Sequence, residues 1–422
     1  MFILISGGMQ MIESSVVYPK PQLVQRAGWF AGVIIGSFLG AIGNYFTSKK
    51  ILFLSGSIFI IIGGILDVLP EDLRQPSASN WIDGAGYGIA IIAIIIMGGD
   101  NSSCRKRGRI LSVEALGSSA GILILCIIWA VYYGLDVGVI GTDGEPSFTV
   151  TQLDGVISIV LGIAGASSAF LCVESPVKCL MDGDECDAAC SVQALHHDHV
   201  AVLQEHKDYV DEDKKRSLCE NILQGIMSFV KLVIVRTFLS LTISFPIVIT
   251  YLFAEVSGYH VKFGLLFFGL TRLVGAFIGQ YLLIDRLGRK WTLAGCSLVI
   301  GAFYIAIGSL LEWPMEVHLV EIASLILVAN LFCGMCMNVP TTYLSEAFSP
   351  SVKPMFLFAI TLVENCAIIV VYSIDEKYSV YYYVVGGFML LICAMAIFAL
   401  PETKGLTLRK SREEFLKGRK TL

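Results

Sequence analysis

A short charged turn lies between two long apolar stretches of the chain, residues 263–283 and 291–310. Its charged and turn-forming residues are Asp285, Arg286, Gly288, Arg289 and Lys290. Each apolar stretch is about long enough to cross a ~30 Å hydrocarbon layer as a helix, and acids and bases between such helices cannot lie in lipid. We therefore expect the turn at a membrane surface, where ion pairs can hold neighbouring helix ends together.

Pairs of an acid and a base recur at matching places in the two halves of the chain. Asp100 stands seven residues before Arg107, which Gly108 follows. Glu346 likewise stands seven residues before Lys353. Both pairs follow the equivalent apolar stretch of their half, which indicates an internal duplication.

Two further features repeat. Glu174 and Glu402 each occur close to a proline, at the end of the sixth apolar stretch of their half. A fainter copy of the charged turn occupies residues 40–50, where it again joins two apolar stretches. One pattern written once in each half is typical of a duplicated membrane protein.

Composition agrees with a protein embedded in lipid. Of 422 residues, 55% are hydrophobic and only 15% are charged, whereas soluble domains average about 25% charged residues. The net charge of −5 does not favour a nucleic-acid partner. The cysteines are scattered, and Cys179, Cys186 and Cys190 with the histidines that follow them fit no closed four-ligand pattern. We expect no bound metal and no cofactor.

The apolar stretches predict eleven membrane spans and one short first span, six before a long polar segment and six after it. We expect a bundle at residues 1–173, a central loop with short helices at 174–225, a second bundle at 226–403 and a basic tail at 404–422. Lys and Arg concentrate in alternate loops. The positive-inside rule then places both termini, the central loop and both turns in the cytoplasm.

These motifs together resemble the sugar porter family of the major facilitator superfamily, and the facilitated trehalose and hexose transporters most of all. The complete turn at residues 285–290 and the segment Pro401-Glu402-Thr403-Lys404-Gly405 carry the resemblance. It implies an all-α fold of two six-helix bundles, here with a truncated first helix, that gives a small solute alternating access to a midplane site. A monomeric plasma-membrane sugar carrier is expected.

The resemblance also implies that the charged residues form a latch that favours the outward-facing state. Its members are Arg107, Glu174, Asp285, Arg289, Glu346 and Glu402. The alternative is that they only mark topology and solvate loop ends. In the first half, Asn44, Thr47 and Ser48 replace the family's acid, glycine and arginine, which predicts a biased or leaky resting state.

The sugar pocket of the family is largely replaced in this sequence. Its amides in the fifth and seventh spans align with Ala115, Ser240, Leu241 and Pro246, and its tryptophan with Thr341. Asn365 keeps the family's residue. The sequence therefore leaves the substrate open, with candidate binding residues Asn338, Thr341, Glu364, Asn365 and Arg272.

Charge is a candidate replacement for the missing amides. Arg272 and Glu364 each lie about ten residues into a span, near mid-depth at 1.5 Å per residue. A charge there is costly unless it is paired, so we expect these two residues to pair, either in the substrate pocket or as a structural tie. Arg236 is expected to reach the membrane surface instead.

The mode of transport depends on the first span in this family. Glu13, at the far end of the short first span, is its only acid, which favours facilitated diffusion over proton symport. Two other functions stay open, namely a non-transporting sensor or decayed duplicate and a carrier of a charged organic solute. The motifs of hydrolases, metalloproteases and phosphate-binding loops are not found, so an enzyme is not expected.

Overall fold

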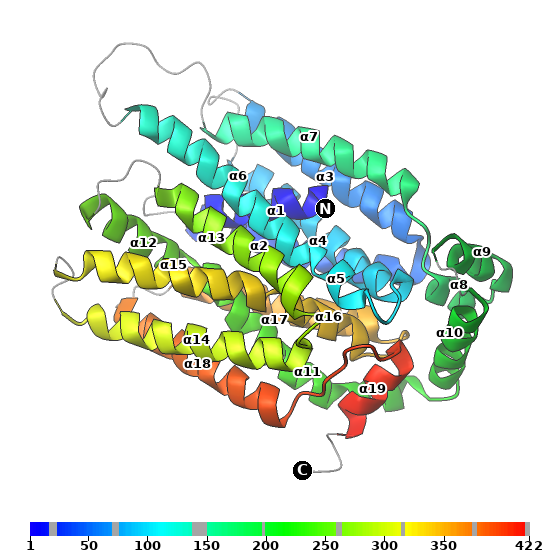
Figure 1. Cartoon of the computed structure of the whole chain (residues 1–422). Helices are drawn as coiled ribbons and strands as arrows, with labels where there is room; N and C mark the ends of the chain where they lie inside the picture. The colour runs from blue at the N-terminus through cyan, green and yellow to red at the C-terminus, as the bar shows by residue number, and fades with distance from the viewer. Residues whose placement is uncertain are drawn as a thin grey trace.

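The helices of the protein follow the apolar stretches of its sequence. The computed structural model describes residues 1–16, 23–69, 76–136, 150–195, 199–258, 264–313, 317–373 and 378–417. Within these ranges eleven helical segments are long and apolar enough to cross a membrane, and Phe2–Glu13 forms a shorter apolar one. The predicted eleven spans and short first span are confirmed (Figure 1).

The spans of the first half are α1 (Phe2–Val16), α2 (Leu23–Phe46), α3 (Lys49–Val68), α4 (Pro76–Asn101), α5 with α6 (Arg107–Leu111 and Val113–Asp136) and α7 (Val150–Leu171). Helix α4 includes polar residues ahead of its apolar stretch. Its first turns carry Ser79, Asn80 and Asp83, which are buried, so hydropathy alone did not find them.

Three short helices connect the halves, α8 (Pro176–Asp182), α9 (Glu185–Leu195) and α10 (His199–Lys214). They lie with the final helix, α19 (Leu408–Lys417), at one end of the molecule (Figure 1). A small apolar cluster that includes Cys179, Tyr209 and Leu408 joins these helices. His196 and His197 lie outside the described residues.

The spans of the second half are α11, η1 and α12 (Leu218–Ser240, Leu241–Ile243 and Phe245–Gly258), α13 with η2 (Gly264–Ile278 and Gly279–Leu283), α14 (Arg289–Leu310), α15 with α16 (Leu319–Cys336 and Asn338–Glu346), α17 (Lys353–Ser373) and α18 (Tyr378–Phe398). Proline explains two breaks. Pro246 and Pro340 have no N–H to donate to the carbonyls of Thr242 and Cys336, and the helices are interrupted just before them.

Close packing depends on small residues. A Cβ at Gly36 of α2 would collide with the backbone carbonyl of Ala85 on α4, so glycine lets these helices approach closely. The main contacts between the halves join α2 to α17 and α6 to α13. Phe30 of α2 also meets Tyr372 of α17, with ring centroids 5.6 Å apart.

Candidate functional site

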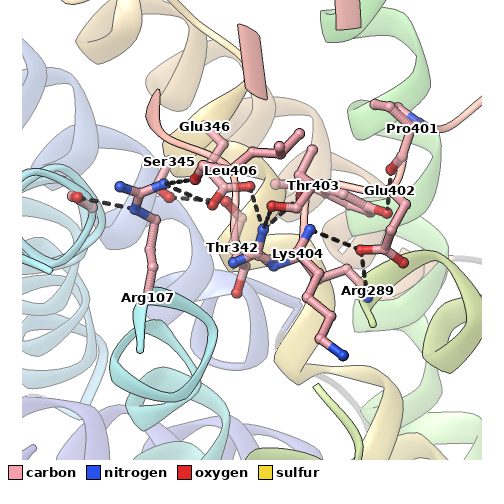
Figure 2. A network of polar contacts seen from close by, with 12 residues as sticks. Arg107, Arg289, Thr342, Ser345, Glu346, Pro401, Glu402, Thr403, Lys404 and Leu406 are labelled. Carbon is pink, nitrogen blue, oxygen red and sulfur yellow. Dashed lines mark hydrogen bonds and ion pairs between the residues drawn. The ribbon is translucent and has the colours of Figure 1, made fainter. Parts of the chain in front are cut away.

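Glu346 of α16 joins the two halves of the molecule through two arginines (Figure 2). Its Oε1 lies 3.2 Å from Nη1 of Arg107, which belongs to the first half. Its Oε2 lies 3.0 Å from Nη1 of Arg289, which belongs to the second. All three side chains are at most 2% exposed. One buried carboxylate thus binds a guanidinium from each half, a strong charge-assisted arrangement.

A second pair crosses between the halves in the opposite sense. Nζ of Lys353, at the start of α17, lies 3.3 Å from Oδ1 of Asp100, at the end of α4. Ser175 donates to the other oxygen of Asp100 at 2.7 Å. Each acid of the duplicated motif therefore pairs with the base of the other half. This exchange makes the pairs able to hold the halves together at the end that carries these residues, hereafter the latch end.

Glu402 and Glu174 cap helices within their own halves. Glu402 accepts from the backbone N–H groups of Arg289 and Lys290, each at 3.1 Å, and Glu174 accepts from the N–H of Lys49 at 3.0 and 3.1 Å. A carboxylate at a helix N-terminus stabilises the exposed N–H groups. These two acids thus hold the duplicated turns in place and do not bridge the halves.

Two glycines make room for these acids. Gly288 has a φ of 101° and faces the carboxylate of Glu402, so a side chain there would be both strained and obstructed. A Cβ at Gly108 would lie 2.7 Å from Oδ1 of Asp285. The glycines of both motifs are therefore needed for close approach.

Asp285 makes a weaker contact across the halves. Its Oδ2 lies 3.7 Å from Nε of Arg109, which is 44% exposed. Burial raises the pKa of the Asp285 carboxyl, although the nearby Arg289 and Arg109 act to lower it. This partly exposed pair contributes less to the latch end than Glu346 does.

The remaining residues of the turn face outward. The Arg286 carbonyl accepts from Nζ of Lys404 at 2.6 Å, and its side chain is exposed. The ammonium of Lys290 lies 5.9 Å from the ring centre of Trp291. Neither side chain joins the halves in the part of the chain that the structure describes.

A cavity of about 50 Å³ lies between the halves, deeper than the latch end. Both halves line it, with Tyr87, Glu114 and Ser118 from the first and Arg236, Arg272, Glu364 and Asn365 from the second. Its volume has room for only a few water molecules. The ion pairs of the latch end lie on one side of this cavity.

An ionic triad crosses this cavity. Arg236 of α11 lies between two acids, with Nη2 2.5 Å from Oε1 of Glu114 on α6 and Nε 3.0 Å from Oε2 of Glu364 on α17. Its Nη1 also donates to Oγ1 of Thr341 at 3.2 Å, and that hydroxyl contacts Glu114. The triad joins the first half to the second through buried charged groups.

The family described as Sugar (and other) transporter matches residues 25–415 of the chain. The match covers well over half of the sequence. The chain belongs to this family. Comparison with curated protein sequences finds none that matches.

Solved structures share the fold of this sugar transporter family member. The proton:xylose symporter XylE bound to 6-bromo-6-deoxy-D-glucose superposes with a TM-score of 0.77 and 18% identity, over 99% of this chain and 95% of that one. A double-tryptophan XylE mutant superposes with a TM-score of 0.80 and 16% identity, over 98% of this chain and 96% of that one. The inward-open form of XylE from E. coli superposes with a TM-score of 0.61 and 17% identity, over 98% of this chain and 95% of that one. The predicted major-facilitator fold is confirmed, and the family is one of transporters, not enzymes.

The expected pair of Arg272 and Glu364 is not formed, and the expectation for Arg236 was wrong. Glu364 binds Arg236, while Nη1 of Arg272 donates to Asn330 at 2.9 Å. Helix α11 begins at Leu218, with a capping box of Ser217 and Glu220, eight residues before residue 226, where the sequence predicts that the second bundle begins. Arg236 therefore lies roughly 27 Å along its helix at 1.5 Å per residue, too deep to reach the surface.

The other candidate residues divide into two groups. Thr341 contacts the triad, and Asn365 lines the cavity while donating to the carbonyl of Thr361 at 2.7 Å. Asn338 instead donates to the carbonyls of Ala276, Gly334 and Met335 at 3.1–3.2 Å. Its amide group is used to satisfy backbone at the break between α15 and α16.

Glu114 was missed by the sequence analysis. A signal for it existed, because it is an acid only a few residues inside the fifth predicted span. A charge within a span needs a partner, and this holds for Glu114 as it does for Glu364. Its neighbour Ala115, which aligns with the family's amide, also lines the cavity.

Proposed function

We propose that this member of the sugar transporter family carries a sugar of hexose or trehalose type across the plasma membrane by alternating access, as a monomer with both termini in the cytoplasm. The observation that carries the proposal is the cavity between the halves, crossed by the triad of Glu114, Arg236 and Glu364. A charged group so deep in a membrane bundle is a functional candidate by default.

Opening must separate pairs that join the halves. The latch end holds Arg107 with Glu346 and Asp100 with Lys353, while Phe30 and Tyr372 meet across α2 and α17 near the other end. A sugar can enter only after one of these two contacts opens. In the proposed cycle the latch parts when the cavity opens toward the cytoplasm, and closes again when it opens outward.

Facilitated diffusion is the leading mode that we propose, since the sequence offers a single acid in the first span. Proton coupling is the second candidate, and a buried group of acids favours it. Glu13 is buried and lies close to Asp154, and buried carboxyl groups placed so close together do not all ionise. Asp67 and Asp83 are also close to Glu13.

The test is uptake into proteoliposomes that contain the purified chain. Labelled glucose and trehalose are supplied with and without an inward proton gradient. We expect saturable uptake of at least one sugar. Uptake that the gradient does not change supports facilitated diffusion, and gradient-driven accumulation that Glu13→Gln abolishes supports coupling. Sugar binding without uptake would instead identify a sensor.

A further inference from the structure

Arg272 is a buried charge that no acid neutralises. It lies on α13 with 1% of its surface exposed. Within the described residues no carboxylate oxygen lies within 4 Å of its guanidinium, whereas Arg107, Arg236 and Arg289 each have such a partner. Its hydrogen-bond partner is the amide oxygen of Asn330. A buried, unpaired guanidinium is costly enough to need an explanation.

The guanidinium also keeps donors unused. Nη1 donates to Oδ1 of Asn330 at 2.9 Å, and that amide is itself held by donating to the carbonyl of Phe268 at 2.7 Å. Nη2 has no hydrogen-bond partner among the described residues. Asn330 therefore orients the guanidinium but does not neutralise its charge, and Nη2 has no partner among the described residues.

The unused donor belongs to a residue that lines the central cavity, which Glu114 and Glu364 line as well. Both of those acids are already bound to Arg236. Of the two arginines that line the cavity, Arg236 therefore binds two acids, whereas Arg272 binds none among the described residues. An acidic group supplied by a solute would complete the second.

We propose that Arg272 binds a carboxylate group of the transported solute, so that a sugar acid is preferred to the neutral sugar of the same skeleton. This inference rests on the proposed transport function and specifies the solute at the same cavity. A carboxylate suits a guanidinium through charge-assisted hydrogen bonds. A single negative charge fits better than a phosphate dianion, because the triad already holds one acid more than it has bases.

Three sugars of one skeleton and different charge test the inference. At neutral pH glucuronate carries one negative charge, glucose is uncharged, and glucosamine carries one positive charge. Each is used as a competitor and as a labelled substrate in proteoliposomes. We expect glucuronate to half-saturate uptake at a concentration roughly ten-fold or more below that of glucose, as a hydrogen bond to a charged group implies. Glucosamine should be no better than glucose.

Variants separate binding from a structural role. Arg272→Gln should abolish the preference for glucuronate while residual glucose uptake remains, and Arg272→Lys should keep part of the preference. Asn330→Ala is the matched structural control, because a mere tie between α13 and α15 would lower the uptake of all three sugars in the same proportion in both variants.

The outcomes are distinct. Equal half-saturation by the three sugars in the unmodified protein overturns the inference while the transport function stands, even if Arg272→Gln does not fold. A proportional loss in the variants overturns it as well. Saturable uptake of none of the sugars, trehalose included, overturns the proposed function itself.

Discussion

At the scale of single residues, a few buried acids hold the two halves together. Glu346 binds Arg107 and Arg289 at one end, and Glu114 binds Arg236 in the middle. Removing one partner of a buried ion pair leaves the other charge without compensation, which is far more damaging than the loss of an exposed pair.

Glu346→Gln keeps the shape of the side chain and removes its charge. We expect it to destabilise the closed protein by about 3 kcal/mol or more, because two buried guanidinium groups lose their acid. The measurement is the apparent melting temperature in detergent. Glu414→Gln is the control, since Glu414 is 38% exposed in its pair with Lys417. Equal melting temperatures for the two variants would contradict the role given to Glu346.

The triad predicts a rescue by a second substitution. Arg236→Gln leaves both Glu114 and Glu364 without a base, and should lower the melting temperature strongly. Adding Glu114→Gln removes one of the two uncompensated acids, so the double variant should be more stable than Arg236→Gln alone. A double variant that is less stable by the sum of the single effects would show that the two residues do not interact.

At the scale of elements, two spans are interrupted where they approach the cavity. The breaks before Pro246 and Pro340 place irregular backbone between the halves, where it is tolerated because protein surrounds it. Met337, at the second break, lines the cavity. Arg236 lies in the last turns of α11, a few residues before the first break. These interruptions set the positions of the residues that face the solute.

The two copies of the charged turn differ in the ion pairs that they form. In the second half Arg289 binds Glu346, but Ser48, at the equivalent place, only caps α3 by accepting from the N–H of Ile51. Asn44 donates to the carbonyl of Gly40 and lines a pocket with Lys178 and two other lysines. The first-half turn therefore adds no ion pair of its own to the latch end.

Asn44→Asp should strengthen the latch end. The new carboxylate would face the lysines of this pocket, stabilise the closed latch and slow its opening, so that initial uptake falls by a few-fold. Asn44→Ala is the control and should leave uptake close to that of the unmodified protein. Since Ser48→Arg would also remove the helix cap, the substitution at residue 44 is the cleaner one. Identical uptake in Asn44→Asp would reject the idea.

At the scale of the whole molecule, the halves meet through contacts of different strength at different depths. Ion pairs close the latch end, the triad crosses the middle, and aromatic rings meet near the far end. Rocking of one half against the other needs contacts that can part and re-form. In the proposed cycle, the described conformation, with ion pairs formed at the latch end, is a stage in which that end is closed.

The sequence by itself determined the architecture. A membrane span must be long and apolar, so hydropathy and the charged turns located eleven spans and the duplicated motifs without any three-dimensional information. The sequence placed Gly108 and Gly288 in these motifs, but only the structure shows how closely they approach Asp285 and Glu402. The predicted domain boundaries at 173, 225 and 403 remain predictions.

Only the tertiary structure decided which charges meet. Asp100 and Lys353, or Arg236 and Glu114, are far apart in the chain, and nothing local selects one partner over another. Depth along a helix depends on where the helix begins, and the early start of α11 moved Arg236 from the surface to the cavity. The same packing left Arg272 without an acid. Pairing follows from three-dimensional proximity in a low-dielectric interior, which spacing along the chain does not encode.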